Sequence, residues 1–117
     1  MSYVDGFIVP VPKDKVDAYK ALAAKAGEIW KEHGALAYVE CLADDVPYGE
    51  VTSFPRAVQV QDGETVAFSW IVYRSRASRD EVVAKVMADE RLKAGMQGVP
   101  FDGKRMIFGG FSPFLEL

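Results

Sequence analysis

The stretch that decides the fold is residues 65–75, Thr-Val-Ala-Phe-Ser-Trp-Ile-Val-Tyr-Arg-Ser. It is rich in the β-branched and aromatic residues that favour strands. Its alternate positions are apolar on both faces, as a central strand that is covered on two sides requires. We therefore predict a central strand here, and the rest of the chain has to supply its neighbours and covers.

Three other segments have the composition of strands, namely residues 3–11, 35–43 and 104–115. The first is closed by a pair of prolines, which cannot donate a hydrogen bond to a neighbouring strand. The last contains Gly109 and Gly110, and paired glycines within a strand predict a bulge or a close approach by another backbone. The chain is therefore expected to form four strands.

Two helices are predicted between these strands. Residues 14–33 carry apolar side chains at helical spacing, and Asp14 is a candidate N-cap. Residues 78–95 begin with Ser78 followed three positions later by Glu81, the pattern of a capping box. Each helix lies between two predicted strands, so the chain contains two strand-helix-strand units.

This order predicts an α+β fold, the ferredoxin-like βαββαβ sandwich. We expect an antiparallel sheet of order 4-1-3-2 with both helices on one face. A length of 117 residues allows one domain, so residues 1–117 are taken as a single unit.

The second face of this sheet also needs a cover. The central strand has no polar side, and the outer strands contribute Phe7, Ile8, Phe108 and Phe111. A large exposed apolar patch is a liability for a soluble protein. A second copy of the sheet is the simplest cover, and we predict a two-fold homodimer.

The composition of the chain excludes several classes of protein. The net charge is −3, which removes the basic surface that nonspecific nucleic-acid binding requires. Cys41 is the single cysteine and cannot form an internal disulfide, which fits a reducing cytoplasm. No signal core, membrane-spanning stretch, metal motif or phosphate loop is found in the sequence, so we expect a cytoplasmic protein without membrane contact or cofactor.

Several short segments along the chain are distinctive. They are Tyr-Val-Asp-Gly-Phe (3–7), Trp-Lys-Glu-His-Gly-Ala (30–35), Asp-Asp-Val-Pro-Tyr-Gly (44–49), Arg-Asp-Glu (79–81), Val-Met-Ala-Asp (86–89), Pro-Phe-Asp-Gly-Lys-Arg-Met (100–106) and Gly-Gly-Phe (109–111). With these segments the chain resembles the YbaA-like family of small bacterial proteins of unknown function. This resemblance implies a dimeric α/β-barrel, a group that includes cofactor-independent monooxygenases, haem-degrading enzymes and lactone isomerases, so the fold alone does not select a reaction.

One end of the predicted sheet gathers candidate catalytic residues. Asp5, His33 and Tyr73 offer a carboxylate, an imidazole and a phenol, which are groups that can transfer protons. The structural alternative is the stronger one. A histidine in the last turn of a helix complements the helix dipole, and Asp5 and Arg74 can form a plain ion pair.

The other end gathers residues 44–64, a connection long enough to be a lid over a site or an arm at an interface. We expect a polar cluster there that binds a ligand or anchors the loop. Paired carboxylates can also bind a divalent cation, but two ligands are weak evidence, and we predict no metal site. Trp70 is a further ligand or anchoring candidate, although its position favours the core. The residues of the expected cluster are Asp44, Asp45, Arg56, Lys104 and Arg105.

Two functions stay open. The first is a small-molecule-binding homodimer, acting as a cofactor-independent enzyme of the monooxygenase or isomerase type on a small metabolite. Its pocket would lie between sheet and helices, with residues 44–64 as a lid. The second is a non-catalytic dimeric interaction or stress-response module whose long connection is an interface arm. Whether the protein is an enzyme is left undecided by the sequence.

Overall fold

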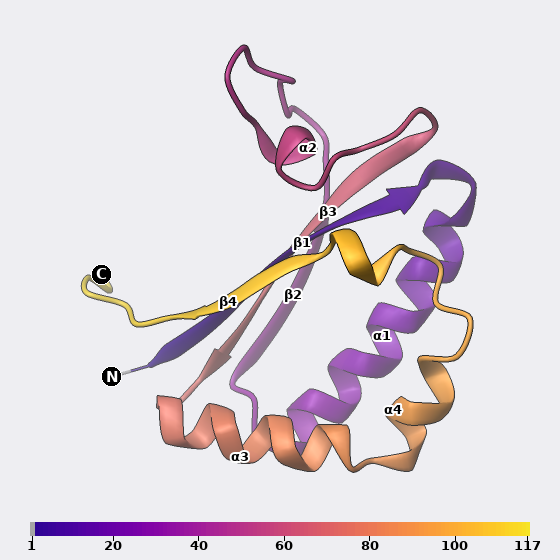
Figure 1. Ribbon diagram of the computed structural model, residues 1–117. Coiled ribbons are helices and arrows are strands. Elements are labelled where there is room, and N and C mark those ends of the chain that lie inside the picture. Colours follow the sequence, from indigo (N-terminus) through magenta and orange to yellow (C-terminus); the bar gives the residue numbers. More distant parts are fainter. Residues whose placement is uncertain (1) are drawn as a thin grey trace.

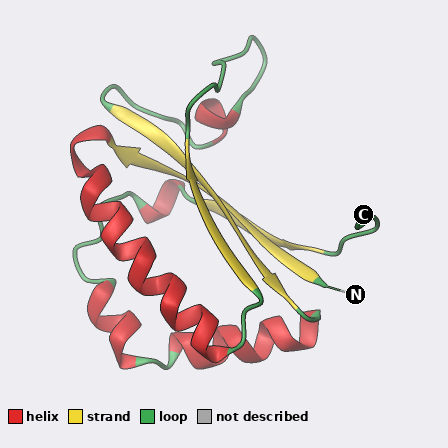
Figure 2. Cartoon of the chain, turned by 180° about the vertical axis from the view of Figure 1, so that it is seen from behind, coloured by secondary structure: helices red, strands yellow, loops and turns green. Residues whose placement is uncertain are grey.

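The computed structural model describes residues 2–117. Figure 1 shows one sheet with its longer helices on one side and the short α2 apart from them at one end, and Figure 2 shows the same arrangement from behind. The elements follow the chain as β1 (Tyr3–Pro12), η1 (Lys13–Lys15), α1 (Val16–His33), β2 (Ala37–Leu42), α2 (Phe54–Ala57), β3 (Glu64–Tyr73), α3 (Arg76–Met87), α4 (Glu90–Gly95), η2 (Gly103–Arg105) and β4 (Ile107–Phe111).

The sheet has the predicted topology. Its strands lie in the order β2-β3-β1-β4, and all neighbouring pairs are antiparallel. This confirms the ferredoxin-like fold and the expected order 4-1-3-2. The central strand β3 pairs along its whole length with β1, from Tyr3 opposite Tyr73 to Pro12 opposite Glu64.

The helix starts differ from the sequence prediction. Asp14 does not cap α1, because η1 precedes the helix and its first turn has no side-chain cap. The second helix begins one turn earlier than expected. Ser75, in extended conformation after β3, is the N-cap and accepts a hydrogen bond from the Ser78 amide. Asp89 then caps a separate helix, α4, so the predicted single helix is broken in two.

The core lies between the sheet and the helices in two clusters. One joins α1 and α3 to the sheet and includes Ile29, Tyr73 and Val86. The other joins Val11 and Tyr19 near the opposite end of the sheet. These contacts fix α1 across β2, β3 and β1, and this placement positions the candidate site described below.

The opposite face of the sheet is apolar and, apart from the short α2 at one end, carries no helix within residues 2–117. Phe7 packs against the core and stacks on Phe108, with ring centroids 6.2 Å apart, so both lie on the helix side. Phe111 pairs with Val4 and therefore lies on the other side. We call this second surface the open face. It includes Val4, Ile8, Phe68, Trp70, Val72, Ile107 and Phe111.

The expected bulge at Gly109 and Gly110 is wrong. Both glycines pair in regular register with β1. Their small size serves side-chain packing instead, because a Cβ on Gly110 would lie 2.4 Å from the Tyr3 hydroxyl oxygen. The Phe111 ring lies over Gly109 at ordinary contact distance.

The long connection between β2 and β3 lies at one end of the sheet (Figure 1). It contains α2, whose Phe54 ring stacks on Phe68 with centroids 5.6 Å apart. The connection is therefore anchored on the open face, while Val51 is 91% exposed. Within residues 2–117, no helix combines the length and apolar character needed to cross a membrane.

Candidate functional site

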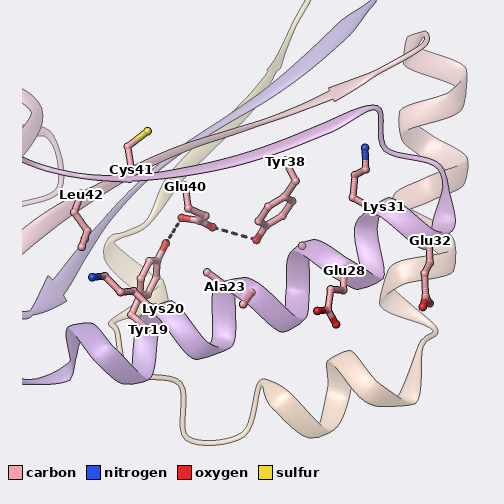
Figure 3. Close-up of a pocket in the computed structure, with 12 residues that line it drawn as sticks. Tyr19, Lys20, Ala23, Glu28, Lys31, Glu32, Tyr38, Glu40, Cys41 and Leu42 are labelled. Atoms are coloured by element: carbon pink, nitrogen blue, oxygen red, sulfur yellow. Dashed lines mark hydrogen bonds between the residues drawn. The ribbon is translucent and has the colours of Figure 1, made fainter.

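A groove of about 940 Å³ runs between α1 and the edge strand β2 (Figure 3). The helix lines it with a tyrosine, small residues and four charged side chains, namely Lys20, Glu28, Lys31 and Glu32, and the strand lines it with residues 38 and 40–42. Figure 3 shows Tyr38 and Glu40 pointing from the strand toward the helix, whereas Cys41 points away. The residues that form its walls include Tyr19, Ala23, Gly27, Tyr38, Glu40 and Leu42.

Glu40 lies at the centre of this groove and is held by two phenols. The Tyr19 hydroxyl donates to Oε1 of Glu40 at 2.7 Å. The Tyr38 hydroxyl donates to Oε2 at 3.1 Å. Each carboxyl oxygen thus accepts one hydrogen bond from a neutral donor, which fixes the orientation of the group.

The electrostatics of the three side chains are coupled. Burial raises the pKa of Glu40, and the hydrogen bonds from Tyr19 and Tyr38 only partly oppose this. Burial and the adjacent Glu40 also raise the pKa of both tyrosines, which therefore remain protonated donors. A carboxyl group with an elevated pKa can exchange a proton closer to neutral pH than an exposed glutamate can.

Local structure explains why these groups meet. Alternation along β2 places Tyr38, Glu40 and Leu42 on the face that looks toward α1. Gly27 of α1 lets the Tyr38 ring lie against the helix, because a Cβ there would be 2.9 Å from Cδ1 of the ring. Trp30 supports the other side of that ring, with centroids 5.9 Å apart.

The candidates predicted at one sheet end fall into separate networks. Asp5 is 6% exposed and accepts a hydrogen bond from Arg79 Nη1 at 2.9 Å, so the expected pair with the exposed Arg74 is wrong. The reason is geometric, because α3 begins directly after β3 and places Arg79 over β1. Burial raises the pKa of Asp5, while Tyr73 and Arg79 act in the opposite direction.

Tyr73 is fully buried in this network, and its hydroxyl accepts a hydrogen bond from Trp30 Nε1 at 3.0 Å. His33 does not join it. Its Nε2 atom lies 2.9 Å from Oδ2 of Asp89, at the start of α4. Hydrogen bonds from Arg91 and His33 lower the pKa of Asp89. The structure therefore brings Asp5 and Tyr73 together and places His33 in a helix-joining contact.

The candidates at the other sheet end do not form the single polar cluster that was expected. Arg105 pairs with Glu64 at 2.7 Å and with Asp102 at 2.9 Å, because both carboxylates lie nearer to it than Asp44 and Asp45 do. Asp44 and Asp45 are exposed, and neither makes an ion pair within residues 2–117.

Arg56 and the remaining candidates have structural contacts of their own. Arg56 donates to the Tyr48 and Gly49 carbonyls at 2.9 and 3.1 Å and covers the Tyr48 ring at 4.0 Å, which folds the long connection onto itself. Lys104 is exposed. Trp70 lies on the open face with its ring edge against Phe68, at a centroid distance of 5.7 Å.

The central residues of the groove were not among the sequence candidates. Tyr19 and Tyr38 fit the apolar pattern of their elements, and Glu40 stands in the sequence only as a neighbour of Cys41. The available signal was the alternation of the strand, which places Glu40 between two helix-facing side chains. Over residues 2–117, no group of three or more His, Cys, Asp or Glu side chains could hold a metal ion.

Comparison with solved structures supports the fold. A dimeric ferredoxin-like protein from an uncultured marine organism matches with a TM-score of 0.61 at 12% identity, covering all of both chains. SnoaB from Streptomyces nogalater, a cofactor-independent oxygenase solved as a mutant, matches with a TM-score of 0.56 at 12% identity, covering 99% of this chain and 94% of that one. At such identities, the likeness concerns the fold.

Sequence relatives are much closer. The uncharacterized protein YbaA of Escherichia coli K12 is 53% identical over 116 residues, which are 99% of each chain. A family described as "Protein of unknown function (DUF1428)" matches residues 2–103. The YbaA-like resemblance is thereby confirmed, and the chain belongs to the DUF1428 family of proteins of unknown function.

Proposed function

We propose that this protein is a homodimer that binds a small metabolite in the groove between α1 and β2 and transfers a proton through Glu40, without a cofactor. The observation that carries the proposal is the position of Glu40. It is a half-buried carboxyl group with a raised pKa, oriented by two phenols and located in an open groove. A group whose pKa is perturbed in a concave site is a candidate for function.

The chemistry that fits this arrangement is general acid and base catalysis. Glu40 as carboxylate can accept a proton from a carbon next to a carbonyl, or from an enol, and can return it at another atom. Tyr19 and Tyr38 keep the carboxyl group oriented while its charge changes. This is the proton movement that an isomerase- or monooxygenase-like reaction on a small carbonyl or aromatic compound needs. SnoaB, which is described as cofactor-independent, has the same fold.

Ligand-induced stabilisation tests this proposal. We expect part of a library of small acids, aromatics, amines and lactones to raise Tm, because a site filled at one hundred times its Kd adds about 2.7 kcal/mol. Glu40→Gln should remove the response. Two controls should retain it: Glu81→Gln, at an exposed residue of α3 outside the groove, and His33→Asn, at the residue that contacts Asp89. A response that survives Glu40→Gln would assign the chemistry elsewhere.

The homodimer is supported by the open face. Its aromatic and aliphatic side chains include Phe68, 41% exposed, and Phe111, 64% exposed. The solved ferredoxin-like protein described as dimeric shows that a protein of this fold can form a dimer. Cys41 is a free exposed thiol, and we place the protein in a reducing cytoplasm, where such a thiol stays reduced.

Two phenylalanines of β4 give a matched test of the dimer. Phe111→Asp places a charge on the open face and should yield monomer or unfolded protein in sedimentation at micromolar concentration. Phe108→Asp places the same charge on the helix side, at a residue that is 70% exposed, and should leave a dimer. Equal behaviour of the two variants, or a stable wild-type monomer, would remove the open face as the interface.

The second candidate is a non-catalytic dimeric interaction or stress-response module, with residues 44–64 as an interface arm. The contact of Phe54 with Phe68 favours an arm beside the open face over a lid on the groove. Tyr48 and Val51 are exposed on this arm. This function becomes the better one if the library gives no Tm shift while shortening of the arm weakens the dimer.

A further inference from the structure

All but one of the buried and half-buried carboxyl residues in residues 2–117 form an ion pair with an arginine. Four of them do so. Asp5 pairs with Arg79 at 2.9 Å. Glu64 and Asp102 share Arg105 at 2.7 and 2.9 Å. Asp89 pairs with Arg91 at 2.8 Å. The remaining one in residues 2–117 is Glu40, for which the structure shows no ion pair over that range.

The lysine side chains near the groove do not neutralise the charge of Glu40. Lys20 and Lys31 both line it, but neither ammonium group lies within ion-pair distance of Glu40 across the described chain. Lys31 donates to the Leu36 carbonyl at 2.8 Å instead. Only the neutral phenols of Tyr19 and Tyr38 make hydrogen bonds to the Glu40 side chain within residues 2–117.

A partly desolvated carboxylate without a countercharge is unfavourable, because burial removes water without supplying another charge. Two events relieve this state: the uptake of a proton and the arrival of a cation. The groove beside Glu40 gives a cation access, whereas Asp5 lies in a closed network. A positively charged ligand in the groove would therefore supply the countercharge that Glu40 lacks.

The walls of the groove suit an organic cation. The rings of Tyr19 and Tyr38 flank Glu40, and aromatic faces attract ammonium groups. Their hydroxyl oxygens donate to Glu40 and keep lone pairs that can accept N–H bonds from a ligand. Ala23 and Ala24 line the helix side with small side chains, beside which an apolar body can lie.

We infer that the ligand of this groove is a small organic cation, an amine or amidine, whose N–H groups bind the Glu40 carboxylate between the two tyrosines. The inference rests on the proposed function insofar as it uses the same groove. It adds the chemical class of the ligand, which the proposed proton transfer leaves open.

A series of compounds with matched carbon skeletons tests the charge requirement. Butylamine, benzylamine and benzamidine are compared at pH 7.5 with butanol, benzyl alcohol and benzamide, and with butyrate and benzoate. Binding is measured by calorimetry and by amide chemical-shift changes in wild-type protein. We expect a cationic member to bind with changes centred on residues 38–42, and the neutral and anionic counterparts to bind at least about tenfold more weakly.

Three variants locate the site. Glu40→Gln should reduce the affinity for the cation at least about tenfold, since the charge is lost while the shape is kept. Glu81→Gln, at an exposed residue of α3 outside the groove, should leave the affinity unchanged. Lys20→Met should raise it, because a competing cation is removed from the groove. Circular dichroism of each variant separates loss of binding from loss of fold.

The outcomes distinguish this inference from the proposed function. Equal or tighter binding of an alcohol, amide or carboxylate at residues 38–42, lost in Glu40→Gln, would overturn the cationic ligand and keep the groove as the site. Cation binding that is unaffected by Glu40→Gln would also overturn it. If no compound in the series binds while an uncharged or anionic member of the wider library gives a Glu40-dependent response, the cationic class is wrong. If neither set binds, both proposals fail.

Discussion

Two strand glutamates show how one residue type serves different purposes in this molecule. Glu64, at the start of β3, accepts hydrogen bonds from Nη1 and Nη2 of Arg105 at 2.8 and 2.7 Å. Glu40, in β2, accepts hydrogen bonds from two neutral phenols, those of Tyr19 and Tyr38. The hydrogen bonds from Arg105 lower the pKa of Glu64, whereas burial raises the pKa of Glu40.

The presence or absence of a countercharge separates carboxylates that stabilise the fold from one that is available for function. A carboxylate whose charge is matched within the protein, such as Glu64, ties together segments distant in sequence, here η2 and β3. A carboxylate whose charge is unmatched weakens the fold when it ionises, and it is retained where it can act on something outside the chain. The comparison can therefore be tested by removing charges from the paired carboxylates or their arginines, and from the unpaired Glu40.

The largest effect is expected where a matched pair is broken. Arg79→Met leaves Asp5 without its cation, and Asp5 is 6% exposed. Removing one partner of a buried pair typically costs about 3–5 kcal/mol, so we expect a loss of stability at the lower end of that range at pH 7. Urea unfolding followed by circular dichroism measures it.

Asp80→Asn is the matched control. Asp80 also contacts Arg79, at 2.9 Å, but its side chain is 62% exposed. Its removal should change stability by less than about 0.5 kcal/mol. A cost of Arg79→Met no greater than that of Asp80→Asn would show that the internal pairs are not structural.

A smaller effect, with opposite signs, is expected from neutralising the two compared glutamates. The raised pKa of folded Glu40 means that its contribution to stability is present below the ordinary pKa of glutamate and is lost as pH rises through the folded value. Glu40→Gln should therefore gain stability relative to wild type as pH rises from 4 to 8, by on the order of 1 kcal/mol.

Glu64→Gln should behave in the reverse way. The lowered pKa of Glu64 gives stability that is present above the ordinary value and is lost as pH falls through the folded value. This variant should be less stable than wild type near pH 7, and its deficit should shrink on acidification. Thermal unfolding at a series of pH values measures both variants. Parallel curves for the two would contradict the distinction between them.

The fold could be predicted from sequence because it depends on patterns that are local. The strand pattern in residues 65–75 and the helical spacing in residues 14–33 predicted the topology, which the structure confirms. The side that the helices cover could not be predicted from residues 65–75, because both faces of that strand are apolar. The start of the second helix was predicted at Ser78, but Ser75, two residues after the end of β3, is the N-cap.

The candidate site was harder to predict because it depends on pairing across the sheet. The expected partner of Asp5 was Arg74 at the end of the third strand, but the position of α3 brings Arg79 to it instead. Glu40 was missed because a glutamate in a strand at the sheet edge usually faces solvent. Its significance comes from Tyr19, 21 positions earlier, which only the packing of α1 brings to it.

The smallest effect on stability is expected from Gly27→Ala, which sharpens the comparison by disturbing only the tyrosine support of Glu40. Alanine in a helix interior is favoured over glycine by up to about 1 kcal/mol, but its Cβ would lie 2.9 Å from the Tyr38 ring and must displace it. These terms oppose each other, so we expect a net change in stability below about 1 kcal/mol. The Tyr38–Glu40 hydrogen bond should nevertheless be lost, and ligand responses that depend on Glu40 should weaken.

Gly95→Ala is the control, because a Cβ there meets Leu22 at an ordinary 3.7 Å and lies away from Glu40. Near-ultraviolet circular dichroism and tyrosine chemical shifts should change in Gly27→Ala and remain as in wild type in Gly95→Ala. Exposing one oxygen of Glu40 to water lowers the carboxyl pKa, and losing the Tyr38 hydrogen bond raises it. Because burial is the larger influence, the pKa measured by NMR should fall toward its ordinary value in Gly27→Ala only. An unchanged Glu40 pKa would mean that the phenols and the helix packing do not isolate this group, and the contrast with Glu64 would then reduce to the presence of Arg105.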